Sequence, residues 1–234
     1  MKLGWKNKDF GWHNQQFDAT RERLLKGGSY KDLSTVWVMP TKGRHLNVRV
    51  VSAIVALQRP MNQICFGPVF LANMEVADAY NSAVEAILAD ANLKKCKYLL
   101  TVEQDNLPPP DGLLRLYESI QKFDGVGGLY FTKGPDGQPM IYGDPNVMPK
   151  NYLPQVPQPD TIQHCNGLGM GFNLFRMEMF RKVPKPWFKT QQDKNGTMSQ
   201  DLYFYNNAAA FGFKFACDTR VKVGHYDEVN DMVW

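Results

Sequence analysis

Two acidic side chains separated by a single residue follow an apolar segment near the middle of the chain. Residues 97–102 (KYLLTV) lead directly into Glu103, Gln104 and Asp105, and a run of prolines over 108–110 comes soon after. Side chains on an extended chain alternate between two faces, so Glu103 and Asp105 point the same way. Carboxylate oxygens at the end of a strand suit Mg²⁺ or Mn²⁺ that binds the phosphates of a substrate. They can also accept hydrogen bonds from a ribose. An isolated pair of this kind also occurs where polar residues only cap a strand end, so the rest of the sequence has to decide.

Two further residues that suit chemistry, Asp201 and His225, lie towards the end of the sequence. Residues 199–202 (SQDL) are typical of a helix start, with Ser199 as the N-cap and Asp201 in the first turn. A carboxylate there complements the helix dipole, or acts as a general base if it faces a cleft. His225 follows the short apolar segment 221–224, where a histidine is either structural or a metal ligand.

A cluster of glycines at residues 167–171 (GLGMG) has a spacing similar to that of dinucleotide-binding glycines. These glycines precede the apolar segment 172–175, which reads as a strand, and they do not open a helix. A nicotinamide cofactor is therefore poorly supported. Glycines in this position fit a close approach of the backbone to a ligand, or a bulge.

The elements that must position these residues alternate between strand and helix. Apolar periodicity predicts strands over 35–39, 63–70, 97–102 and 125–131, and helices over 47–57, 75–88 and 111–120. Such strand-then-helix units argue for an α/β fold with a parallel sheet covered on both faces. Residues 132–160 hold seven prolines and little periodicity, which predicts a long ordered loop over one end of the sheet.

The composition indicates a globular chain with a modest positive charge. It has 234 residues, of which 44% are hydrophobic, and a net charge of +4. We expect one domain over residues 34–234 and an N-terminal arm over residues 1–33, which carries most of the excess charge. The arm also contains aromatic residues, so it either contacts a polyanion or packs its aromatic side chains on the domain.

No apolar run approaches the length of a membrane-spanning helix, and the first residues have no hydrophobic stretch of the signal-peptide type. We therefore expect a cytoplasmic protein without a membrane span. The four cysteines are scattered and form no C-x-x-C pair, which predicts reduced, mostly buried thiols.

The order of five sequence blocks resembles that of the GT-A glycosyltransferases, particularly the compact family 2-like enzymes of bacteria and bacteriophages. The last block is the most specific, because it is similar to the family's "E-D-x-x-F … G-F … D-T … V-x-H" ending. The blocks are 35–44 (TVWVMPTKGR), 79–81 (AYN), 98–106 (YLLTVEQDN), 167–183 (GLGMGFNLFRMEMFRKV) and 199–225 (SQDLYFYNNAAAFGFKFACDTRVKVGH). The resemblance implies a Rossmann-like, mixed, mostly parallel sheet with helices on both faces, and a nucleoside diphosphate sugar as donor substrate.

The resemblance also implies roles for individual residues. Asp105 matches the second acid of the family's D-x-D motif, which binds Mn²⁺ or Mg²⁺ at the donor's phosphates, and Glu103 matches the first acid, which faces the ribose or the metal. His225 matches a late histidine that completes the metal shell, and Asp201 matches the catalytic base. The remaining matches lie near the nucleotide (Pro40, Thr41, Arg44, Asn81 and Gln104) or on the acceptor side (Gly169, Gly171, Trp187 and Gln200).

Three positions depart from the family pattern: Glu103 replaces an Asp, Gln200 replaces the Glu before the presumed base, and Tyr80 replaces an Arg. The leading hypothesis is a metal-dependent transferase that moves a sugar from a nucleoside diphosphate sugar to a hydroxyl acceptor. The first choice of donor is a UDP-sugar, and the transfer is expected to invert the anomeric centre of the sugar. One candidate acceptor is a hydroxymethylated base in phage DNA, which would have to be flipped out of the duplex. The departures keep open a non-catalytic module that binds nucleotide sugars. A nucleotidyltransferase of similar fold is a third alternative, although only residues 42–44 show a weak similarity to the activating loop of such enzymes.

Overall fold

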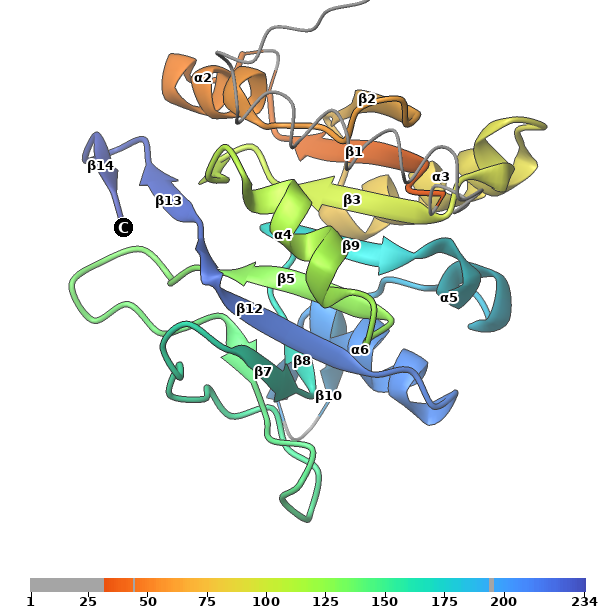
Figure 1. The fold of residues 1–234 in the computed structure, drawn as a ribbon. Helices are drawn as coiled ribbons and strands as arrows, with labels where there is room; N and C mark the ends of the chain where they lie inside the picture. The colour runs from red at the N-terminus through yellow and green to blue at the C-terminus, as the bar shows by residue number, and fades with distance from the viewer. Residues whose placement is uncertain (1–31, 44, 194–195) are drawn as a thin grey trace, which may run out of the picture. The chain divides into compact units, whose positions relative to one another are not determined.

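A seven-stranded sheet forms the centre of the fold in the computed structural model, which describes residues 32–43, 45–193 and 196–234 (Figure 1). The strands, in their order across the sheet, are β2 (Cys65–Ala72), β1 (Thr35–Thr41), β3 (Tyr98–Val102), β9 (Phe172–Arg176), β5 (Gly125–Leu129), β12 (Phe215–Lys222) and β7 (Ile162–Cys165). Strands β2, β1, β3, β5 and β12 run in one direction, and β9 and β7 run in the other. The predicted mixed, mostly parallel sheet is confirmed.

Helices cover both faces of this sheet, because the strands are apolar on both sides. Successive residues of β1 alternate between two cores: Val36 and Val38 belong to one, and Trp37 and Met39 to the other. The first core packs against α3 (Val76–Ala89), α5 (Met177–Lys182) and α6 (Gln200–Ala210), and the second against α2 (Val48–Ala56) and α4 (Gly112–Ser119). In Figure 1, α4 lies in front of the sheet and α6 behind it.

The predicted elements agree with the structure within a few residues at their ends, with two differences in character. Strand β1 continues through Pro40 to Thr41, where the sequence predicted a break. The segment after the glycine cluster forms β9, which lies antiparallel between β3 and β5 and separates two groups of parallel strands. Local periodicity does not indicate strand direction, and the alternation of strands and helices favours parallel neighbours, so the antiparallel direction of β9 could not be inferred from the pattern.

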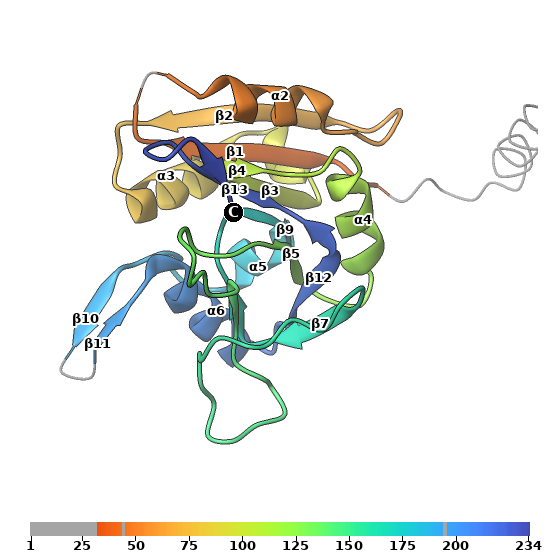
Figure 2. The ribbon, with the colours of Figure 1, turned by 90° about the vertical axis from the view of Figure 1, so that its left-hand side faces the viewer.

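Short strands outside the sheet hold its loops in place. Strand β13 (Gly224–Asp227) pairs with β4 (Asn106–Leu107) on one side and with β14 (Met232–Val233) on the other. Strand β6 (Ile141–Tyr142) pairs with β8 (Gly167–Leu168), and it is the only regular element within the predicted long loop 132–160. The β10 (Gln191–Asp193) and β11 (Gly196–Met198) hairpin extends away from the sheet (Figure 2).

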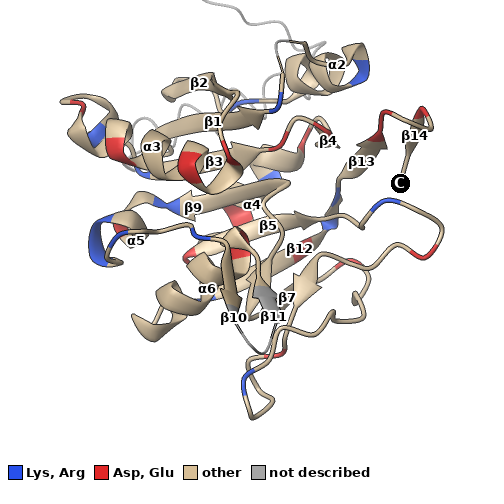
Figure 3. Cartoon of the chain, turned by 180° about the vertical axis from the view of Figure 1, so that it is seen from behind, with Lys and Arg blue, Asp and Glu red and all other residues tan. Residues whose placement is uncertain are grey.

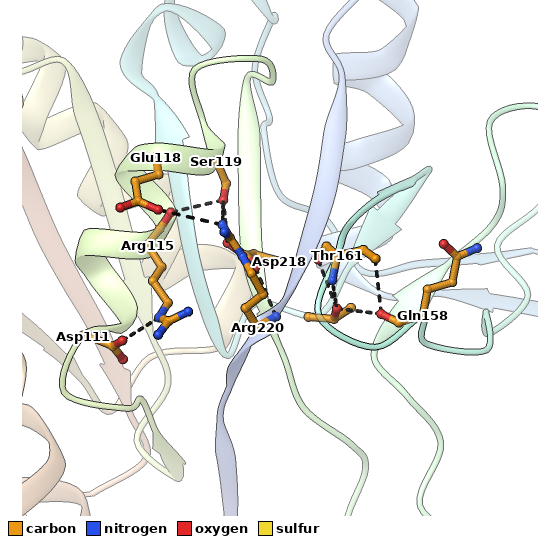
Figure 4. A network of polar contacts seen from close by, with 9 residues as sticks. Asp111, Arg115, Glu118, Ser119, Gln158, Thr161, Asp218 and Arg220 are labelled. Carbon is orange, nitrogen blue, oxygen red and sulfur yellow. Dashed lines mark hydrogen bonds and ion pairs between the residues drawn. The ribbon is translucent and has the colours of Figure 1, made fainter.

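A buried carboxylate ties β12 to α4. Asp218 is fully buried, and its Oδ2 accepts hydrogen bonds from Ser119 Oγ at 2.5 Å and from the Arg220 guanidinium at 2.8 Å (Figure 4). Its Oδ1 accepts a second hydrogen bond from Arg220 Nε at 2.9 Å. This pairing satisfies a charge that would be costly to leave alone in the interior.

The described residues from Leu33 to Trp234 form one compact unit. Residues 1–31 lie outside the described part of the chain, so the predicted N-terminal arm stays a prediction. All four cysteines are free; Cys65 is half-buried and the other three are buried, in agreement with the prediction of reduced, mostly buried thiols. Within the described ranges, no helix combines the length and the apolar character needed to cross a bilayer.

Candidate active site

A cavity of about 420 Å³ opens where β1 and β3 end, at the carboxyl edge of the parallel strands. Ligands of open α/β sheets collect at this edge. The end of β1, the turn before α3, the turn after β3 and the first residue of α6 all line the cavity; the lining residues are Pro40, Thr41, Lys42, Met74, Glu75, Val76, Glu103, Gln104, Asp105 and Gln200. Six residues predicted from the sequence are thus brought together: Pro40, Thr41, Glu103, Gln104, Asp105 and Gln200.

Asp105 lies between two basic side chains. Its Oδ2 is 2.6 Å from Lys133 Nζ and 3.4 Å from His225 Nε2. Burial alone raises the pKa of Asp105, but the hydrogen bonds and charges of His225 and Lys133 outweigh it and lower the pKa to about 2. Asp105 is therefore a carboxylate at neutral pH, as a metal ligand has to be.

His225 is held by the chain on its other ring nitrogen. The β4 and β13 pairing sets His225 opposite Asn106, next to Asp105, and its Nδ1 lies 2.7 Å from the carbonyl oxygen of Phe131. A carbonyl only accepts, so Nδ1 is the donor and carries the proton. Nε2 is then the atom on the Asp105 side: with a proton it donates to the Asp105 carboxylate, and without one it offers a lone pair to a metal, as in a metal-ligating histidine.

Two side chains of the site, Asp105 and His225, have the chemistry of metal ligands. Asp105 and His225 converge, although no cluster of three His, Cys, Asp or Glu side chains that could hold a metal occurs among the described residues. Mg²⁺ and similar ions are often bound by one or two protein side chains, with substrate phosphates and water as the other ligands. The donor set fits such an ion, except that the Lys133 ammonium contacts the same Asp105 oxygen.

Glu103 differs from its neighbour Asp105. Burial, followed by the nearby charges of Asp105 and Asp201, raises the pKa of Glu103 to about 8. Glu103 is therefore mainly protonated at neutral pH, when it can donate a hydrogen bond as well as accept one. One carboxylate and one carboxylic acid thus line the same cavity.

Asp201 follows Gln200 in the first turn of α6; it is 7% exposed and is not among the residues that line the cavity. Ser199, the predicted N-cap, occupies the cap position, but its hydroxyl bonds the Asp201 carboxylate and not a backbone N–H. The Leu202 N–H donates to the same carboxylate oxygen at 2.9 Å. Burial nevertheless raises the pKa of Asp201, which strengthens it as a proton acceptor.

Two basic residues that line the cavity or contact the site were not predicted as site residues from the sequence. Lys42 donates its backbone N–H to Gln104 Oε1 at 2.6 Å, which connects the turns after β1 and β3. Lys133 reaches Asp105 from the turn after β5. Basic residues in turns are common, and only the fold brings these two to the carboxylates.

Four of the residues matched to the family serve the packing of the fold instead. Trp187 is only 2% exposed, and its indole donates to the Val183 carbonyl, so it is not open to an acceptor. Asn81 lies outside the cavity: its amide donates to the Phe188 carbonyl and accepts the backbone N–H groups of residues 187 and 188. Gly169 and Gly171 both leave room for the Tyr130 side chain. Arg44 lies outside the described residues.

The comparisons with known proteins bear on the fold. The crystal structure of A197 from STIV matches with a TM-score of 0.61 and 17% identity, over 86% of this chain and 92% of that chain. The chain has a GT-A fold. The crystal structure of S. aureus TarS 1-349 matches with a TM-score of 0.46 and 10% identity, over 79% of this chain and 57% of that chain, and this likeness is too low to support an argument. No protein-family model and no curated protein sequence matches the chain.

Proposed function

We propose that this GT-A protein is a glycosyltransferase that moves a sugar from a nucleoside diphosphate sugar to a hydroxyl acceptor. The observation that carries the proposal is the cavity at the ends of β1 and β3, which Glu103, Gln104 and Asp105 line, together with the approach of His225 to Asp105. If the end of β3 had only a structural role, a histidine from β13 would not be required within 3.4 Å of the Asp105 carboxylate. The cavity lining includes one lysine, three acidic and two amide side chains, which are groups that can bind a charged diphosphate directly or through a cation.

In the proposed reaction, the bond between the sugar's anomeric carbon and the diphosphate oxygen breaks while the acceptor oxygen forms a new bond to that carbon. Asp201 takes the proton of the acceptor hydroxyl. A divalent ion held by Asp105 and His225 would offset the charge on the departing diphosphate. Protonated Glu103 can donate a hydrogen bond to a donor oxygen, and Gln104 fixes the turn that carries Lys42.

The donor is proposed to be a UDP-sugar, and attack from the side opposite the diphosphate would invert the anomeric centre. The proposed acceptor is a hydroxymethylated base in DNA, in a bacterial or phage-infected cell. Its support is the basic, aromatic arm of residues 1–33. In the view of Figure 3, basic and acidic segments of the described chain are interspersed, so the arm is the element that would carry contacts to a polyanion.

The first test is release of nucleoside diphosphate from a panel of UDP-, GDP- and dTDP-sugars with Mn²⁺, in the absence and presence of hydroxymethylated DNA. Asp201→Asn should lower transfer about a hundredfold or more and leave donor binding intact, because it removes only the proton acceptor. Asp105→Ala should abolish metal-dependent donor binding. Glu178→Gln, on the exposed side of α5, is the matched loss of a surface carboxylate and should behave as wild type. Full transfer by Asp201→Asn would show that the base is assigned wrongly.

A second candidate is a module that binds nucleotide sugars without turnover. It is favoured by Gln200, which lines the cavity where the resemblance leads us to expect a second acid. The same panel separates the two: metal-dependent donor binding with no nucleoside diphosphate release, with or without acceptor, would support the module. Release of pyrophosphate would point to a nucleotidyltransferase.

A further inference from the structure

A tight turn after β5 reaches over the end of β3. Residues 131–139 fold back on themselves: the Thr132 N–H donates to the Gln138 carbonyl at 2.9 Å, the Gly137 N–H donates to the Gly134 carbonyl at 3.1 Å, and Phe131 forms a bridge with Pro139. Gly134 has a φ of +107°, which favours glycine at the tip. The turn is therefore a defined element, and Lys133 projects from it.

This turn acts on Asp105 by two routes that meet at one oxygen atom. Lys133 Nζ contacts Asp105 Oδ2 directly at 2.6 Å. The carbonyl of Phe131 orients His225 at 2.7 Å, and His225 Nε2 lies 3.4 Å from that same Oδ2. The oxygen that would share a metal ion with His225 is thus already paired with an ammonium.

An ammonium and a divalent ion exclude each other at this position. The lysine amine has three donors and no lone pair while it is protonated, so it cannot join a metal shell, and its charge repels a cation a few ångströms away. The Lys133 and Asp105 side chains are 34% and 30% exposed, so the pair is weak enough to exchange. Lys133 is long and flexible, and a diphosphate in the cavity would offer its ammonium a more negative partner.

We propose that Lys133 competes with the divalent metal for Asp105 when no donor is bound, and moves onto the diphosphate when donor and metal bind together. The inference rests on the proposed function and adds a positioning residue to it. When the metal binds alone, it has to displace the Lys133 ammonium, which weakens metal binding. When the donor is also bound, its diphosphate accepts the ammonium and offsets part of this loss. Metal and donor should therefore strengthen each other's binding, and each must do so by the same factor.

The test is Mn²⁺ binding to the free protein, measured by electron paramagnetic resonance without any donor. Lys133→Met should bind Mn²⁺ about tenfold more tightly than wild type, because the competing charge is gone. Lys133→Arg should stay near wild type. Lys185→Met is the matched control: it removes an exposed lysine that pairs with a carboxylate, Glu85, outside the lining of this cavity, so its Mn²⁺ affinity should equal that of wild type.

A second measurement reverses the sign of the effect. With Mn²⁺ saturating, UDP should bind Lys133→Met about tenfold more weakly than wild type in calorimetry, because the diphosphate loses a cationic partner. If the Lys133 ammonium only stabilised its turn, its removal would not both strengthen metal binding and weaken nucleotide binding.

The outcomes separate this inference from the proposed function. Equal Mn²⁺ affinity in wild type and Lys133→Met, with binding abolished by Asp105→Asn, would leave the metal site standing and overturn the competition. Tighter Mn²⁺ binding with unchanged UDP binding would overturn the transfer of Lys133 to the diphosphate. No Mn²⁺ binding to any variant would refute the metal site of the proposed function, and the competition would fail with it.

Discussion

Replacement of Glu103 with glutamine should remove a loss of stability that the wild-type protein suffers as the pH rises. The folded protein holds the pKa of Glu103 at about 8, against 4.5 for an unperturbed glutamate. Between these two values the unfolded chain releases a proton that the folded chain keeps, so the free energy of unfolding falls with rising pH. Below pH 4.5 the group is protonated in both states and has no effect, and above pH 8 the loss is complete.

The size of the effect follows from the shift. One pKa unit corresponds to about 1.4 kcal/mol, so the whole shift sets an upper limit of about 5 kcal/mol. Glu103 lines an open cavity, where solvent screens its interactions, and we expect about 2 kcal/mol. Glutamine has the shape and hydrogen-bonding groups of a protonated glutamate without the proton to lose. The variant should therefore match wild type near pH 4 and exceed it by about 2 kcal/mol at pH 9.

The assay is urea unfolding from pH 4 to pH 9, in the presence of a chelator so that metal binding does not contribute. Asp105 does not interfere, because its folded pKa of about 2 places its own loss of stability at lower pH. Glu85→Gln, on the exposed side of α3, reports what the loss of a surface carboxylate does. A constant difference between wild type and Glu103→Gln over the whole range would refute the raised pKa of Glu103 and the carboxylic acid assigned to the site.

Three further substitutions test the structural roles of other residues by urea unfolding at pH 7. Asp218→Ala should cost about 3 kcal/mol, because its arginine partner loses a buried carboxylate; a cost below that of a surface substitution would contradict the network. Asn81→Ala should lower the free energy of unfolding by about 2 kcal/mol, because residues 187–188 lose their hydrogen bonds to its side chain, while UDP affinity stays unchanged. Weaker UDP binding would indicate that Asn81 contacts the nucleotide. Gly169→Ala should cost about 2 kcal/mol, since the methyl group would collide with the Tyr130 side chain, and an unchanged midpoint would show that this packing gives way easily.

The parts of the site that could be predicted from the sequence are those that follow an apolar run. Strand β3, which precedes Glu103, and strand β1, which contains Pro40, are each apolar on both faces, so the edge at which they end can be inferred from local pattern. Asp201 is similar, because a helix start has its own residue preferences. These signals predict the α/β class and the position of the cavity.

Other features depend on contacts between distant parts of the chain. Lys133 lies in a proline-rich segment without periodicity, and nothing local indicates that it reaches Asp105. The group that orients His225 is the backbone carbonyl of Phe131, which any residue would supply. Trp187 matched an acceptor residue by its place in the sequence, yet it packs near Phe180 in the core, where its burial depends on helices that the local pattern does not place.

From the attachment of β13 we expect the site to open more readily than the central sheet. Asp105 and His225 meet only because two very short strands pair, with the Tyr226 N–H donating to the Asp105 carbonyl at 2.7 Å. Few backbone hydrogen bonds hold this pairing, so β13 can detach while the central sheet stays folded, as low-stability segments do in native proteins. A ligand that bridges Asp105 and His225 would tether the strand, so slower exchange of the Tyr226 amide hydrogen would report occupancy of the site without any turnover.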